Sequence, residues 1–279
     1  MALKGEVFMN RKFGLKEIGY TILLVIIVLL SNFPILWTFK ISIEPVDLIF
    51  KEPLRVIFSP TIQGYRVVLG EFSLFFFNSI AVALLSTLLS IIIGFPAAYS
   101  IARFNTGGEN LSFWILSLKF IPPVAFLIPM YIWISSIGLL DNILGLVLVH
   151  LILNLPLTIW FLRSYIEEIP IENEEAAMVD GCSRAQAMFH ITLPLTSSAI
   201  VATAVLAFIT SWNEYLSALV LTYTRAKTWP VALAQFIGLF RVSYNELAAA
   251  AMIGMIPSIA LAIIMRKHLV RGMTLGILK

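Results

Sequence analysis

Long apolar stretches alternate with short polar ones along most of the chain. The apolar stretches cover residues 18–39, 72–101, 111–134, 143–162, 200–223 and 247–265. A helix that crosses a bilayer needs about 20 mostly apolar residues, and each stretch is close to or above that length. The pattern therefore predicts an all-α, polytopic membrane protein with six transmembrane helices and with both chain ends on the same side of the membrane.

The first apolar stretch follows a basic segment, as the core of a signal peptide would. A cleaved signal ends after a short core at a small-residue site. This stretch instead continues through Asn32 and Pro34 without such a site. We therefore expect an uncleaved first helix.

The polar stretches define the organisation of the chain. We expect an N-terminal tail (1–17), a first helix (18–39), a loop (40–71), a transmembrane core (72–265) that contains a polar segment (163–198) and a second loop (224–246), and a C-terminal tail (266–279).

The polar segment 163–198 is too long for a simple connection between two helices. Pro170 and the acids after it are typical of a helix start, and Gly181 is typical of a left-handed helix end. Ser183 would then cap a second, amphipathic helix that Pro194 ends. The sequence predicts a helix-turn-helix that stands off the membrane surface.

Small residues recur every four positions in two spans, as Gly94, Ala98 and Ala102 and as Ala250 and Gly254. Such stripes let helix backbones approach closely in lipid, so we interpret them as packing faces. Prolines within the predicted spans would bend or interrupt them, which suits either a transport pathway or simple kinks; they are Pro96, Pro122, Pro123, Pro129, Pro156 and Pro257.

Composition agrees with the membrane interpretation, because 59% of the residues are hydrophobic, 13% are charged, and the mean hydropathy is +0.94. A water-soluble enzyme or a disordered chain would carry more charge. The single cysteine, Cys182, cannot form an internal disulfide, so the fold needs no oxidising compartment. The net charge of +3 suggests anchoring at the membrane surface rather than nucleic-acid binding.

The distribution of basic residues predicts the orientation. The link 135–142 after the third span holds no Lys or Arg, whereas both tails are basic, so we expect both ends in the cytoplasm of a cell with this chain in its inner membrane. The basic residues of the two tails are Lys4, Arg11, Lys12, Lys16, Arg266, Lys267, Arg271 and Lys279.

One motif lies in the polar segment. Glu175, Ala176 and Ala177 are followed by three residues, Gly181, nine more residues, and then Ile191, Leu193 and Pro194. This spacing resembles the EAA motif of ABC importer permeases. Asp180 before the glycine and Phe189 in the second helix resemble the carbohydrate branch, specifically the smaller permease subunit of maltose and trehalose systems.

The resemblance runs nearly end to end. It includes residues 78–79, 97–104, 138–142, 212–215 and 271–276. Cys182, where the family usually has alanine, and Ser197 and Ser198 depart from the pattern without touching the core of the motif.

The resemblance implies a type I ABC importer permease fold with a cytoplasmic coupling helix. The small Ala176 and Ala177 would allow a partner backbone to approach, Glu175 would pair with a basic residue in a cleft of the ATPase, and Gly181 would supply the turn. The other interpretation of this segment is a solvated acidic loop. The implied partners are a second permease subunit, two ATPase subunits, an extracytoplasmic sugar-binding protein and membrane lipid, with no nucleic acid.

The chain lacks the motifs of an enzyme. It has no G-x-x-x-x-G-K-[ST] loop, so we expect ATP and Mg²⁺ to bind the partner ATPase and no cofactor to bind here. Asp47, Asp141 and Asp180 lie outside the spans, and the three histidines are scattered. We predict no catalytic residues and no metal site.

Two regions are candidates for contact with substrate or binding protein. In the fifth span, Trp212, Asn213, Glu214 and Tyr215 combine aromatic rings, an amide and a carboxylate, which suit sugar hydroxyls and ring faces. Alternatively, Glu214 only braces neighbouring helices.

The loop 224–246 aligns with the family's loop that reaches into the binding protein, either as a docking segment or as a disordered one. Its candidate contacts are Trp229, Pro230 and Gln235.

The predicted function is that of a permease subunit that forms half of an alternating-access path for a di- or oligosaccharide. The alternative is a self-powered secondary transporter or channel. Such a protein would be expected to carry inverted repeats or a relay of buried acids, and the sequence offers one buried candidate acid.

Overall fold

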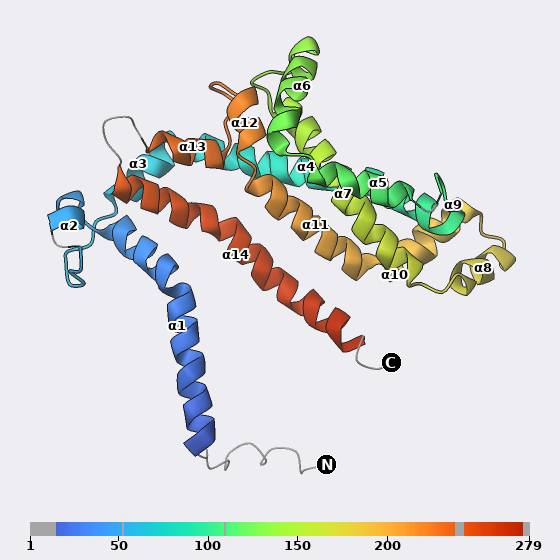
Figure 1. The fold of residues 1–279 in the computed structure, drawn as a ribbon, viewed down its shortest axis with the longest axis horizontal. Coiled ribbons are helices and arrows are strands. Elements are labelled where there is room, and N and C mark those ends of the chain that lie inside the picture. The colour runs from blue at the N-terminus through green and yellow to red at the C-terminus, as the bar shows by residue number, and fades with distance from the viewer. Residues whose placement is uncertain (1–14, 52, 109, 238–242, 276–279) are drawn as a thin grey trace.

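The computed structural model describes residues 15–51, 53–108, 110–237 and 243–275, and within these ranges it is helical, with no β-strand (Figure 1). Four of the predicted basic tail residues, Lys4, Arg11, Lys12 and Lys279, lie outside the described residues. The other four, Lys16, Arg266, Lys267 and Arg271, lie in helices, and only their backbone is described. The elements are α1 (Leu15–Ile43), α2 (Val46–Lys51), α3 (Gln63–Glu71), α4 (Ser73–Phe104), α5 (Leu111–Ser117), η1 (Leu118–Phe120), α6 (Pro123–Ser136), α7 (Ile143–Glu167), α8 (Glu172–Val179), α9 (Arg184–Ala187), η2 (Met188–Thr192, a π-helical turn), α10 (Leu193–Leu195), α11 (Ser197–Trp212), α12 (Leu216–Leu221), α13 (Trp229–Gln235) and α14 (Tyr244–Leu275).

Four helices are long and apolar enough to cross a membrane, within Gly19–Ile43, Ser73–Phe104, Ile143–Glu167 and Tyr244–Ile264. Two bent pairs, Leu111–Phe120 with Pro123–Ser136 and Arg184–Leu195 with Ser197–Trp212, bring the number to six if each pair is one span. The prediction of six spans is consistent with this arrangement.

Two predicted spans are not single straight helices. The third turns by 97° between Phe120 and Pro123, where Pro122 and Pro123 remove two backbone donors. The fifth ends as α11 at Trp212 and resumes as α12 at Leu216. The two predicted loops also contain helices: α2 and α3 lie within 40–71, and α13 lies within 224–246.

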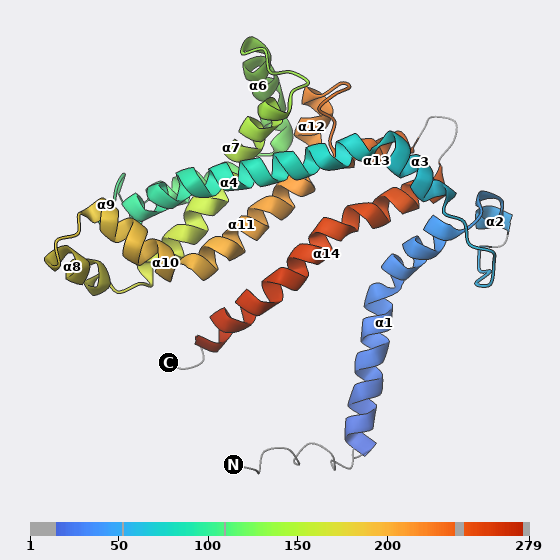
Figure 2. The same ribbon diagram turned by 180° about the vertical axis from the view of Figure 1, so that it is seen from behind.

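The core of the fold is a bundle of α4, α7 and α11, with α8 and α9 at one end and α3 and α13 at the other (Figures 1 and 2). Gly94 permits the close approach of α4 and α7, because a Cβ there would lie 2.7 Å from Thr158 Cγ2. Ala98 and Ala250 are fully buried. The stripes predicted from small residues are therefore packing faces.

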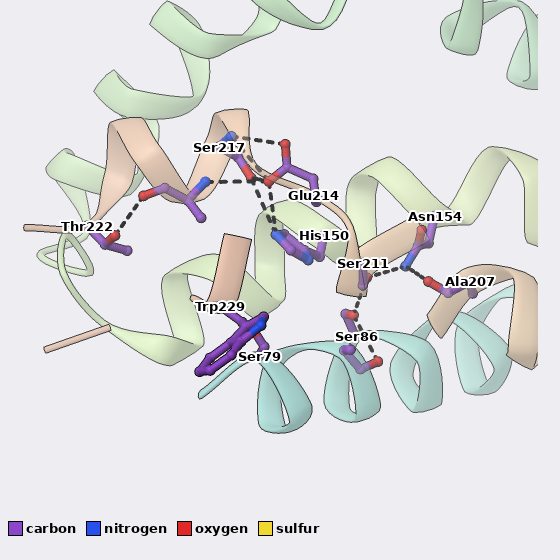
Figure 3. Close-up of polar contacts among 12 residues, drawn as sticks. Ser79, Ser86, His150, Asn154, Ala207, Ser211, Glu214, Ser217, Thr222 and Trp229 are labelled. Carbon is purple, nitrogen blue, oxygen red and sulfur yellow. Dashed lines mark hydrogen bonds and ion pairs between the residues drawn. The ribbon is translucent and has the colours of Figure 1, made fainter. Parts of the chain in front are cut away.

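Hydroxyl and amide groups link the three helices inside the bundle (Figure 3). Ser86 of α4 and Ser211 of α11 are joined at 2.9 Å, and Asn154 of α7 donates to Ser211 Oγ at 2.9 Å and to the Ala207 carbonyl at 3.3 Å. In an apolar bundle such bonds hold helices together where the hydrophobic effect between helices is weak.

At the α13 end of the bundle, side chains at the start of α4 form hydrogen bonds with the backbone of the segment that leads into α13. Asn78 donates to the carbonyls of Arg225 and Lys227, and Ser79 accepts the N–H of Trp229 at 2.7 Å. These contacts give residues 78–79, which carried part of the family resemblance, a structural role at the start of α4.

Asp141 makes the densest of these connections. Its carboxylate accepts four consecutive backbone N–H groups, those of residues 223–226, and the Thr224 hydroxyl. Burial raises the pKa of Asp141, but the bonds from Tyr223, Arg225, Ala226 and Thr224 outweigh it and hold the pKa well below its usual range. The link between α6 and α7 is thereby attached to the link between α12 and α13.

Candidate functional site

Helix α8 forms as the acidic stretch predicts. Its first turn carries Glu172, Glu174 and Glu175, which complement the positive end of the helix dipole. The helix begins at Glu172, two residues after Pro170. The Pro170 carbonyl accepts the N–H of Asn173, which is in the first turn of the helix.

Gly181 ends the α8 region in the left-handed conformation, at φ +97°, as predicted. A Cβ at this position would meet nothing within 4 Å, so the backbone conformation and not lack of space favours glycine. The N–H groups of Gly181 and Cys182 then bond back to the carbonyls of Met178 and Ala177.

The second helix begins at Arg184, and Ser183 caps it by forming a capping box with Gln186. The prediction that Pro194 ends this helix is wrong by a short distance, since the helix continues to Leu195 and bends by 76° into α11 around Thr196. Pro194 lies in the first turn of α10, directly after the π-helical turn Met188–Thr192, and the first turn of a helix tolerates a residue without an N–H.

The predicted motif residues lie mostly on the outer face of the segment. Glu175, Ala176, Asp180, Gly181 and Pro194 are exposed, while Ala177 and Leu193 are half-buried. Two large apolar side chains accompany them, Val179 at 87% exposed and Phe189 at 52% exposed. An acid flanked by exposed apolar groups on a protruding helix is a surface suited to binding a partner.

The neighbouring acid, Glu174, points the other way and was missed by the sequence analysis. It is 4% exposed, and its carboxylate receives bonds from Arg103 Nε at 2.8 Å, Thr192 Oγ1 at 2.8 Å and the Tyr99 hydroxyl at 2.7 Å. Burial raises the pKa of Glu174, but these bonds and the Arg103 charge hold it below its usual value.

At the opposite half of the bundle, the break between α11 and α12 contains the predicted substrate residues. Asn213 donates to the Ile209 carbonyl at 2.9 Å, and the Glu214 carboxylate accepts the N–H of Ser217 at 3.0 Å. These local bonds compete with the helical ladder and explain why the helix stops here.

Glu214 is directed into the protein (Figure 3). It is bonded to the Ser217 hydroxyl and lies 3.4 Å from Nε2 of the buried His150 on α7. This arrangement favours the alternative in which Glu214 braces α12 against α7.

The other three predicted residues, Trp212, Asn213 and Tyr215, line a cavity of about 560 Å³. The cavity lies between the α11–α12 break, α13, α14 and α1, and Trp229 and Pro230 also line it. The remaining lining residues are Ile35, Leu233, Ala251, Gly254, Met255, Ser258 and Ile259. Aromatic rings with a few polar groups in a cavity of this size are typical of a small-molecule site.

The structure places the three predicted docking residues differently from one another. Trp229 is 2% exposed and donates to the Ala250 carbonyl at 3.2 Å, so its ring is not on a surface that a binding protein can reach. Pro230 is half-buried and Gln235 is exposed. The sequence could not separate these positions, because a short helix in the loop turns them to different sides.

Comparisons with known proteins give a consistent result. Residues 90–275 match the family described as binding-protein-dependent transport system inner membrane component. The chain is 33% identical over 270 residues to a probable ABC transporter permease of Sinorhizobium fredii, covering 95% of this chain and 96% of the relative.

Two relatives have named transport systems. The trehalose transport permease SugB of Mycobacterium tuberculosis is 34% identical, with 88% of this chain and 92% of SugB covered. The trehalose/maltose permease MalG of Thermococcus litoralis is 32% identical, with 95% and 98% covered. A solved bacterial ABC transporter involved in the import of the acidic polysaccharide alginate aligns with a TM-score of 0.74 and 25% identity, covering 93% of this chain and 98% of that chain.

Proposed function

Because this chain belongs to the family of binding-protein-dependent transport system inner membrane components, we propose that it is a permease subunit of an ATP-driven importer of di- or oligosaccharides. SugB is named for trehalose and MalG for trehalose and maltose, which supports a sugar of that class. A binding-protein-dependent family also favours this function over a self-powered transporter or channel.

The observation that carries the proposal is the outer face of α8. This helix lies beyond one end of the bundle (Figure 1). It exposes Glu175, Ala176 and Val179, and Phe189 lies exposed on the following π-helical turn. An exposed acid beside apolar side chains suits a cleft with a basic residue in an ATPase. ATP and Mg²⁺ would bind that partner, and the α8 end and both chain termini would lie in the cytoplasm.

The assembly that we propose contains a second permease, two ATPase subunits and an extracytoplasmic sugar-binding protein. The closure of the ATPase pair would act on α8 and open the path outward, and hydrolysis would reverse the movement. On the extracytoplasmic side, Pro230 and Gln235 would be the predicted residues that lie nearest to the binding protein. Trp229 would be buried beneath them and would hold α13 in place.

Binding of the ATPase tests the proposal directly. Val179 and Ile57 are both 87% exposed, but Ile57 lies in the connection between α2 and α3, far from α8. Val179→Asp should weaken binding of the ATPase to the purified complex by about tenfold or more, since it desolvates a charge in the interface. Ile57→Asp is the matched control and should bind normally. Uptake of sugar by the chain without any ATPase would refute the proposal.

The cavity beside the α11–α12 break is our candidate for part of the sugar path. Trp212 and Tyr215 would stack on pyranose faces, and Asn213 would bond hydroxyls. Asn213→Ala should raise the KM for trehalose or maltose uptake without changing ATPase binding. An unchanged KM for both sugars would remove Asn213 from the path.

A further inference from the structure

One carboxylate joins three elements at the α8 end of the bundle. Glu174 lies in the first turn of α8, Tyr99 and Arg103 lie one turn apart near the end of α4, and Thr192 closes the π-helical turn that leads toward α11. All three partners donate to the same side chain within 2.8 Å. Thr192 is fully buried, Tyr99 is 6% exposed, and the Arg103 side chain is 7% exposed.

Helix stability alone does not require this arrangement. Glu172 and Glu175, in the same turn, complement the helix dipole while remaining exposed. Burying a carboxylate is costly unless its oxygens are bonded and its charge is paired, and here both conditions are met. Position 174 therefore needs a charged hydrogen-bond acceptor that is held in one place, whereas an exposed acid would be enough to complement the helix dipole.

Two further contacts attach the same segment to α4. Arg103 also donates to the carbonyl of Ile169, at the start of the connection into α8, at 3.0 Å. The guanidinium of Arg184, on α9, lies over the Phe104 ring at 5.3 Å. The end of α4 thus contacts the chain just before α8, through Ile169, and just after it, through Arg184. Glu174 makes the contact between these two, from α8 itself.

We infer that Glu174 is a positioning residue that makes α8, the end of α4 and the π-helical turn move as one body. The inference rests on the proposed coupling to an ATPase: a displacement of α8 would reach α4 through Arg103 and Tyr99 and reach α11 through Thr192. Glu175 would contact the ATPase, whereas Glu174 would pass the movement to the spans.

The test uses the complete transporter with its ATPase and binding protein, reconstituted in lipid. Glu174→Gln keeps the shape of the side chain and removes its charge. Glu172→Gln is the matched control, because Glu172 is an exposed acid in the same turn. Nitroxide labels at Asn173 on α8 and Ile93 on α4, both exposed positions, report the distance between the two helices in a Cys182→Ser background.

In the wild type and in Glu172→Gln, the label distance should change by less than about 2 Å, the size of a small helix shift, between the nucleotide-free and ATP-bound states. In Glu174→Gln the distribution should broaden and shift on ATP binding. Uptake of trehalose or maltose should fall by about tenfold or more, as expected for the loss of a charge-assisted hydrogen bond, while ATPase binding stays within about twofold.

A second variant guards against failure of the first to assemble. Thr192→Val keeps the shape and removes one donor, so it should give a smaller change of the same kind. If both variants keep the wild-type label distances and uptake, the inference is wrong, although the proposed function stands. If the wild-type complex binds no ATPase, the proposed function itself fails.

Discussion

Replacing Asp141 tests whether one carboxylate holds the outer connections together. Asp141→Ala removes the acceptor for four backbone N–H groups and the Thr224 hydroxyl, and it places alanine at φ +51°. Residues 223–225 are exposed, so water replaces the carboxylate at their N–H groups at little cost. Ala226 is 1% exposed, and its unpaired N–H would cost about 1–3 kcal/mol.

The left-handed conformation adds to this cost. Alanine at such a φ costs about 1 kcal/mol, whereas asparagine tolerates it and keeps one acceptor oxygen. The sum for Asp141→Ala is about 2–4 kcal/mol of local stability, and Asp141→Asn should lose about 1 kcal/mol. Glu71→Ala, an exposed acid at the same end of the bundle, is the control.

Hydrogen–deuterium exchange of peptides that cover residues 222–228 measures this local opening. A loss of 2–4 kcal/mol corresponds to exchange that is faster by roughly thirtyfold to a thousandfold. Equal exchange in Asp141→Ala and the wild type would refute the reasoning, and so would an Asn variant as fast as the Ala variant.

The same assay has a pH arm. Because the folded-state pKa of Asp141 is lowered, its contribution is fully present above the ordinary aspartate pKa of about 3.9 and is lost as the pH falls through the lowered value. Exchange corrected for its intrinsic pH dependence should therefore stay constant from pH 7 to about pH 5. A rise in opening within that window would contradict the assignment of the charged form.

Four further substitutions test other parts of the structure. Gly181→Val should leave assembly in the membrane intact but uncouple ATP hydrolysis from uptake, because a β-branched residue resists φ +97°; unchanged uptake would contradict this. Gly94→Ala should destabilise the bundle by about 1–3 kcal/mol in thermal unfolding, and Thr158→Ser should restore part of the loss by removing the methyl that lies 2.7 Å from the new Cβ. Asn154→Leu should cost about 0.6–1.7 kcal/mol by the same measurement, with no loss at all arguing against the bond to Ser211.

The sequence predicts those features that depend on local chemistry. Gly181 and Ser183 mark a turn and a cap by residue type alone, and both appear in the structure. Small-residue spacing likewise predicts the close contact at Gly94. These signals need no knowledge of what lies across the interface.

Features that depend on distant partners could not be predicted in this way. Glu174 and Glu175 are adjacent and identical, and only the arrival of Arg103 and Tyr99 from α4 buries the first and leaves the second exposed. The sequence signal for this contact was the pair Tyr99 and Arg103, two polar residues one turn apart at the end of an apolar helix. Trp229 was misjudged for the same reason, because α4 and α14 supply the contacts that bury it.

The first helix has a consequence for how this chain tolerates change. None of the residues from Gly19 to Leu36 is buried by the rest of the chain, and α1 contacts α3 and α14 mainly near its last turns, where Asn245 bonds the carbonyls of Ile41 and Ser42. Apart from Ile35, which lines the cavity beside the α11–α12 break, one apolar residue can therefore replace another along this arm without disturbing the remainder of the polypeptide. Selection on this stretch therefore acts through what surrounds the chain, whereas the last turn of α1 is held in place by Asn245.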